Sequence, residues 1–165
     1  MTANEALERV LLSYKRYYDI NRDTPLEPFA AEAEFHSVEK GYFLLKKAVT
    51  SESETNEYIF FYEGDTLSAD DVEILGRKAW DEGMSRVEPS GSHRNSDVTV
   101  ILLADHIEEG AAEAVKNLRY YRSYKFRFNG WSDFRIVAVE ASSGKVIYNR
   151  RGSELKKVFR KVVTV

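Results

Sequence analysis

One stretch of the sequence combines carboxylates with an imidazole, a set of side chains suited to metal binding or acid–base chemistry. Asp105, His106 and Glu109 follow directly after an apolar run at residues 98–104. Ligands of open α/β sheets tend to bind at the carboxyl ends of such strands, where these groups could hold a divalent cation or transfer protons. A structural interpretation is that Asp105 caps the following helix together with Glu108, while the acids complement its positive end. We favour the structural interpretation and expect no resident metal or cofactor.

A polar loop expected at residues 83–96 offers hydrogen-bond donors for a phosphate group. Its candidate binding residues are Arg86, Ser92, His93 and Arg94. Exposed backbone N–H groups beside arginine can bind anions. The stretch has no phosphate-loop or nucleophile-elbow motif, so we favour an ordinary surface loop.

A basic and aromatic stretch at residues 116–135 has the composition of a surface that follows a phosphate backbone and stacks bases. Its candidate binding residues are Arg122, Lys125, Arg127 and Trp131. Tyr124, Phe126 and Phe128 occupy alternate positions, which in a strand would place the rings on one face and the cations on the other. We therefore expect a half-buried strand whose rings belong to the core, with the nucleic-acid surface as the alternative.

Hydrophobic periodicity places these stretches in a mixed α and β fold. Apolar spacing predicts helices over residues 2–18, 68–83, 105–118 and 153–162. Strand-like patterns cover residues 32–38, 42–49, 56–62, 98–104, 124–128, 134–140 and 145–149, with residues 39–41 and 51–55 as the first two connections. Apolar residues on both faces of the runs at 56–62 and 98–104 predict central strands. The expected fold is one three-layer α+β domain over residues 1–165, with a mixed sheet of five or six strands between helices in the order α-βββ-α-β-α-ββ(β)-α.

This order of elements resembles the core of restriction-endonuclease-like nucleases. In that family one strand carries an acidic residue followed two positions later by lysine, and the preceding strand carries an aspartate. The strand expected at 56–62 has Glu57 followed by Ile59 where lysine should stand, and the strand expected at 42–49 has no aspartate. The resemblance covers topology only and implies a degenerate nuclease-like domain.

Two further segments resemble an uncharacterised family of bacterial hypothetical proteins. They are residues 42–48 (YFLLKKA) and residues 128–135 (FNGWSDFR). The similarity extends over residues 30–152 and implies a recurring single domain without an assigned function.

Composition excludes several classes of function. The chain of 165 residues has no cysteine, which excludes disulfides, cysteine-bound zinc, iron–sulfur clusters and thiol catalysis. The N-terminus lacks a basic segment followed by an apolar run, and no apolar run approaches the roughly 20 residues of a membrane helix, so we expect a cytoplasmic protein without membrane contact. The charge is uneven: residues 1–115 carry 11 basic and 24 acidic residues, whereas residues 116–165 carry 13 basic and 3 acidic residues.

No catalytic motif emerges, and three functional hypotheses remain open. We rank first a non-enzymatic binding or interaction module that self-associates into a homo-oligomer through oppositely charged faces. The second is a nucleic-acid-associated or degenerate nuclease-like protein, which the overall pI of about 5.7 disfavours. The weakest is a small-molecule or metal-dependent enzyme that uses the region of Asp105.

Overall fold

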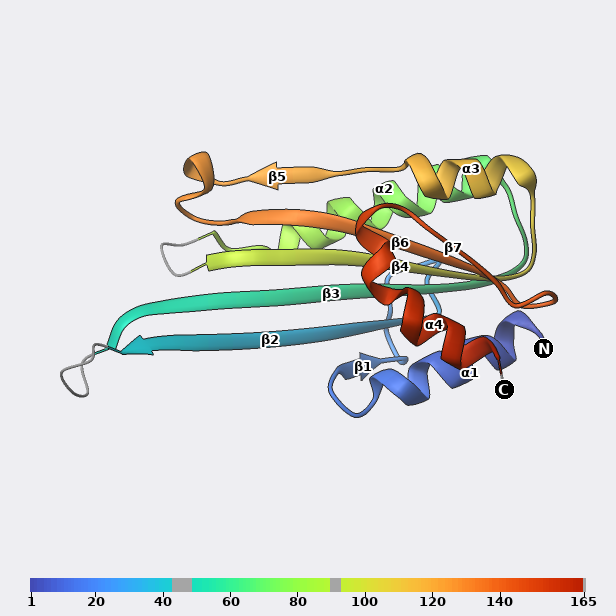
Figure 1. Ribbon diagram of the computed structural model, residues 1–165, viewed down its shortest axis with the longest axis horizontal. Helices are drawn as coiled ribbons and strands as arrows, with labels where there is room; N and C mark the ends of the chain where they lie inside the picture. Colours follow the sequence, from blue (N-terminus) through green and yellow to red (C-terminus); the bar gives the residue numbers. More distant parts are fainter. Residues whose placement is uncertain (43–48, 90–92, 165) are drawn as a thin grey trace.

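The computed structural model describes residues 1–42, 49–89 and 93–164 and contains one mixed sheet between two layers of helices (Figure 1). The elements are α1 (Ala3–Tyr14), β1 (Asp19–Asn21), β2 (Ala31–Tyr42), β3 (Val49–Leu67), α2 (Ala69–Arg86), β4 (His93–Ile107), α3 (Glu109–Asn117), β5 (Tyr121–Ser123), the 3₁₀ turn η1 (Lys125–Arg127), β6 (Trp131–Glu140), β7 (Lys145–Tyr148), the 3₁₀ turn η2 (Arg151–Leu155) and α4 (Lys156–Val163). The expected three-layer α+β fold is confirmed. In the described part of the chain the sheet has seven strands rather than five or six.

The strands follow the spatial order β1-β2-β3-β4-β6-β5. The central strands β3, β4 and β6 are parallel, and every other pair is antiparallel. Both β5 and β7 pair with β6: β5 pairs with its first residues and β7 with its last. The outer edge of β6 is therefore shared by two short strands.

The central strands carry apolar side chains on both faces, as their sequence predicts. On β3, Tyr58 and Phe60 pack into the core under α2 and α3, whereas Ile59 and Phe61 pack into the core under α1 and α4. The run at residues 98–104 of β4 is fully buried and divides between the same two cores. Because β3 and β4 pair with each other in the middle of the sheet, neither face of these strands reaches solvent there.

The predicted capping boxes of α1 and α2 are both present, at Thr2 and at Ser68. The predicted ends of these helices are wrong. The first helix ends at Tyr14 rather than Tyr18, because the chain turns there into the edge strand β1. The second continues through Gly83 to Arg86, since Gly83 is buried where α2 approaches β4.

The β2–β3 hairpin is longer than the sequence predicts. Residues 39–41 lie within β2 and pair with residues 51–53 of β3, so neither expected polar connection is a turn. Backbone hydrogen bonds alone hold an antiparallel ladder, and polar residues can therefore continue it. The strand expected at 42–49 falls largely on residues 43–48, which lie outside the described residues.

No helix within the described ranges is long and apolar enough to cross a bilayer.

Candidate functional site

Two rows of polar side chains cross the sheet near the start of its parallel strands. On the face of α1 and α4, Glu57, Asp97 and Asp133 are in register on β3, β4 and β6. On the opposite face, Asn56 and Ser96 are in register with Ser132. Helices α1 and α4 lie toward the end of the sheet that carries both chain termini (Figure 1).

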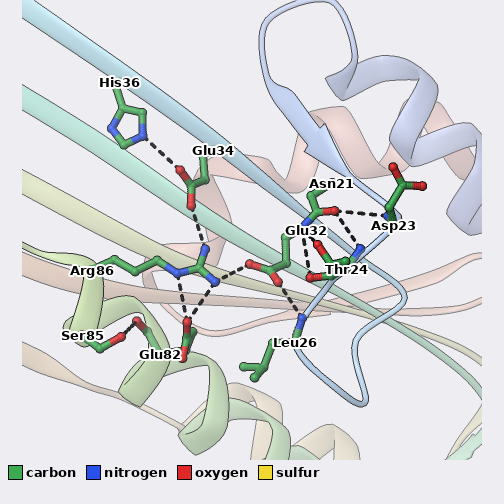
Figure 2. Close-up of polar contacts among 10 residues, drawn as sticks. All are labelled: Asn21, Asp23, Thr24, Leu26, Glu32, Glu34, His36, Glu82, Ser85 and Arg86. Atoms are coloured by element: carbon green, nitrogen blue, oxygen red, sulfur yellow. Dashed lines mark hydrogen bonds and ion pairs between the residues drawn. The ribbon is translucent and has the colours of Figure 1, made fainter.

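Arg86, a predicted phosphate ligand, lies at the end of α2 and joins that helix to β2 (Figure 2). Its Nη2 is 2.6 Å from Glu32 Oε1 and its Nη1 is 2.7 Å from Glu34 Oε1. Its Nε donates to Glu82 Oε1 at 3.1 Å. Three carboxylates around one guanidinium leave a negative surplus that repels anions. Arg86 is therefore in a helix rather than in the expected loop, and its donors are taken by the fold.

The Arg86 cluster is extended on both sides by hydrogen bonds (Figure 2). Glu32 Oε2 accepts the Leu26 N–H at 2.6 Å, which fixes the chain before β2. Glu34 Oε2 is 3.1 Å from His36 Nε2, and His36 Nδ1 is 2.7 Å from Asn56 Oδ1. The hydrogen bond to Asn56 raises the pKa of His36, and Glu34 adds to the effect. The cluster is a structural link between β2, β3 and α2.

A second buried ion cluster lies on the opposite face of the sheet, around Arg135. Its Nη2 is 2.6 Å from Asp97 Oδ2, and its Nη1 is 3.7 Å from Glu57 Oε1. The Tyr18 hydroxyl donates to Glu57 Oε2 at 2.8 Å, and Glu154 lies 3.3 Å from Arg135 at the rim. This cluster ties the connection after α1 to the three central strands.

Asp97 is the most perturbed carboxyl group of this cluster. Burial raises its pKa to about 6, opposed by the attraction of Arg135 and assisted by the repulsion of Glu57. Its Oδ1 and the Nε of Arg135 are buried without a hydrogen-bond partner. The pair is thus held by one short contact between Asp97 Oδ2 and Arg135 Nη2. Asp97 Oδ1 could accept a further hydrogen bond, and Arg135 Nε could donate one.

The structure does not bring the metal candidates Asp105, His106 and Glu109 together. Asp105 lies in β4, and its Oδ1 accepts the Ala3 N–H at 2.7 Å, so it supports the start of α1 instead of capping α3 as expected. His106 Nδ1 is 3.2 Å from Glu140 Oε2 on β6, while Glu109 is exposed in the first turn of α3. Among the described residues, no three His, Asp or Glu side chains form a group that could hold a metal ion.

The expectation of a strand at residues 124–128 with its rings in the core is wrong. The chain leaves β5 after Ser123 and forms η1, and the side chains of Phe126 and Phe128 are 95% and 82% exposed. The core is already closed here, because the short β5 pairs only with residues 131–133 of β6. Alternating rings and cations fit a half-buried strand, but no element in the described part of the chain covers them at this edge.

Hydrogen bonds close the η1 turn. The Tyr124 N–H donates to the Gly130 carbonyl at 3.0 Å, and the Asn129 N–H donates to the Tyr124 carbonyl at 3.2 Å. The Tyr124 hydroxyl is 3.0 Å from Ser132 Oγ. Lys125 and Phe126 have positive φ angles of 45° and 51°, a region that bulky residues seldom adopt and that is enriched at functional sites.

Exposed cations accompany these exposed rings. We call the following six residues the β5 edge: Arg119, Tyr121, Arg122, Lys125, Phe126 and Phe128. Tyr121 is 56% exposed. A hollow of about 370 Å³ borders the edge and is lined by Arg119, Tyr121, Arg150 and Arg151, among others. Its acidic residue Asp133 is paired with Arg151 at 2.7 Å, so the hollow keeps a positive surplus.

The remaining predicted binding residues are scattered. Ser92 lies outside the described residues, and His93 and Arg94 begin β4. Arg127 lies in η1, and Trp131 is the half-buried first residue of β6. Of the predicted set, Arg122 in β5 and Lys125 in η1 are both exposed.

Sequence reasoning missed the hollow beside the β5 edge. Arg150 and Arg151 directly follow β7, and only the pairing of β7 with β6 brings them near Arg119 and Tyr121. The adjacent arginines are visible in the sequence as a possible anion-binding pair. Because they are distant from residue 119 along the chain, the sequence does not indicate that they line the same hollow.

Comparison with known proteins identifies the family. A family model described as a domain of unknown function (DUF8052) matches residues 2–161, so the chain belongs to this family. The searches of curated proteins and of solved structures found no match. The expected membership of an uncharacterised family is confirmed, and its bacterial origin stays a prediction.

Proposed function

We propose that this member of the DUF8052 family is a non-enzymatic binding module that recognises a negatively charged partner through the β5 edge. The observation that carries the proposal is the exposure of Phe126 and Phe128, 95% and 82%, beside exposed cations. Large apolar side chains that remain together in solvent are typical of interaction sites. The neighbouring cations support a negatively charged partner.

The cations of the β5 edge are not used by the fold. Among the described residues, no ion pair involves Arg119, Arg122 or Lys125. By contrast, Arg86 and Arg135 are each surrounded by carboxylates in the interior. Exposed unpaired cations attract an anionic partner over about 8–10 Å at physiological salt.

The buried titratable groups support a binding module rather than an enzyme. Glu32 and Glu34 are engaged by Arg86, and Asp97 by Arg135. Each of these carboxylates connects strands or helices of the fold. We therefore assign the two clusters to stability.

The proposal is tested by retention on a heparin resin, a generic polyanion. We expect the variant R119S/R122S/K125S to elute at clearly lower salt than the wild type. The matched control removes three exposed cations from α4, as K157S/R160S/K161S, and should elute close to the wild type. Equal elution of the two triple variants would overturn the proposal, because overall charge would then explain retention.

A second candidate partner is another copy of this chain. Exposed acids gather where β3 and β4 end and α2 and α3 begin, at Asp65, Asp70, Glu73, Glu108 and Glu109. This acidic end lies opposite η1 along the length of the sheet (Figure 1). Contact between unlike ends is heterologous and would produce rings or open chains. Light scattering over a salt series should then show a mass that falls as salt rises, whereas a constant monomer mass would reject self-association.

A further inference from the structure

We infer that the negatively charged partner is a single-stranded nucleic acid, whose bases stack on Phe126, Phe128 and Tyr121 while its phosphates contact Arg119, Arg122 and Lys125. The inference rests on the proposed function and names the partner class. It depends on three features of the β5 edge: the chemistry of its rings, the hydrogen-bonded η1 turn and the adjacent hollow.

The rings select a partner that offers flat apolar faces as well as charge. A polyanion recognised by charge alone gains nothing from Phe126 and Phe128. Unpaired bases offer such a face at every position, and stacking on aromatic side chains tolerates any sequence. A duplex hides these faces in its own stack, so the rings favour a single strand.

The η1 turn presents the rings without a large ordering cost on binding. Its hydrogen bonds from Tyr124 to Gly130 and from Asn129 to Tyr124 fix the backbone, and Lys125 and Phe126 are held at positive φ. A pre-organised surface loses less conformational entropy when a ligand binds. Backbone strain that persists on an exposed turn, where the core gains nothing from it, is consistent with a binding role.

The hollow extends the surface beyond the rings. Its volume of about 370 Å³ falls within the range of small-ligand sites, and Arg119, Tyr121 and Arg150 line it. Arginine pairs well with phosphate, and the tyrosine ring offers a further stacking face. Because β5 has only three residues, a short oligonucleotide can span the hollow and η1 together. A membrane surface could contact the protruding rings but could not enter the hollow.

The test measures fluorescence anisotropy of labelled oligothymidylate and oligouridylate at low salt. Parallel arms use a duplex of the same length, vesicles with anionic lipid, and heparin as competitor. We expect saturable binding of the single strands that weakens with salt at a slope of about −2 in log–log form, from roughly three phosphate contacts.

The ring variant F126A/F128A keeps every charge and removes the stacking faces. We expect at least a ~10-fold rise in Kd for the single strand, since the two stacked bases together contribute that much or more. Tyr17→Ala, which removes a ring that is 67% exposed on the chain after α1, is the matched control and should leave Kd unchanged. Circular dichroism and thermal unfolding confirm that all variants fold.

The outcomes separate this inference from the proposed function. Absence of binding to oligonucleotides together with heparin binding at the β5 edge overturns the inference and leaves the proposed function standing. Absence of binding to heparin overturns both. Preference for duplex or for vesicles, or an unchanged Kd in F126A/F128A, also overturns the inference.

Discussion

At the scale of residues, depth decides what each arginine does. Arg86 and Arg135 have side chains 25% and 14% exposed, and each is neutralised by carboxylates from other elements. Arg119 and Arg122 are exposed and have no ion pair among the described residues. A buried cation must be paired because burial of an isolated charge is costly. An exposed one remains available to a partner.

Replacement of Arg135 by methionine should be strongly destabilising. It would leave Asp97 and Glu57 buried on one face of the sheet without their shared cation. Breaking a buried ion pair in this way costs about 3–5 kcal/mol, measured as the free energy of unfolding in urea. Arg151→Met is the control: Arg151 also pairs with an aspartate, but it is 46% exposed, and its loss should cost at most about 1 kcal/mol. Equal costs would show that the burial of Arg135 is not what matters.

Asp97 should make stability depend on pH between about 4 and 6. Its pKa is raised by burial from 3.8 to about 6, so the native state binds this proton more tightly than the unfolded chain. The stability that it contributes is complete below the unfolded pKa and is lost as pH rises through about 6. Asp97→Asn removes this contribution, so from pH 4 to pH 7 its free energy of unfolding should gain about 2 kcal/mol relative to the wild type. Parallel urea-unfolding profiles of the two proteins over this range would contradict the assignment.

At the scale of elements, α2 lies unusually close to β4 at Gly83. A Cβ atom built on Gly83 would lie 2.4 Å from Val98 Cγ2, a fully buried side chain. Gly83 therefore serves close packing inside a helix, not helix termination.

Gly83→Ala should destabilise the protein by about 1–3 kcal/mol through overpacking, despite the better helix propensity of alanine. Gly110 in α3 is the matched control, because its Cβ would meet only Ala69 Cβ at an ordinary 3.7 Å. Gly110→Ala should therefore stabilise by about 0.5–1 kcal/mol. The sign of the difference in thermal midpoint decides the point, and stabilisation by both substitutions would contradict the close approach.

The predictable part of the fold is the part set by local patterns. Capping boxes at Thr2 and Ser68 and the two-sided apolar runs of β3 and β4 are encoded within a few residues. Asp105 was misassigned as a cap of α3 because its actual partner, the Ala3 N–H, is 102 residues away. The rings of the β5 edge are wrongly expected in the core for a similar reason: alternation at 124–128 fits a strand, and only the closed sheet edge leaves Phe126 in solvent.

At the scale of the whole molecule, the uneven distribution of charge along the sequence corresponds to a separation of acidic and basic surfaces along the sheet. Most acids precede residue 116, and the exposed ones at Asp65, Asp70, Glu108 and Glu109 occupy the end where β3 and β4 finish. The β5 edge and η1 lie toward the other end, away from both termini (Figure 1). A negative overall charge is thus compatible with an anion-binding surface, because the two signs are separated in space.

The central claim is that the β5 edge is the binding surface, and a titration followed by ¹H–¹⁵N correlation spectra tests it most directly. With a short heparin fragment as the probe, we expect shifts confined to the amides of residues 119–128 and 150–151, with the spectra of the Arg86 cluster and of the starts of α2 and α3 unchanged. Shifts concentrated at the acidic end or around Arg86, or no shifts at saturating probe, would contradict it.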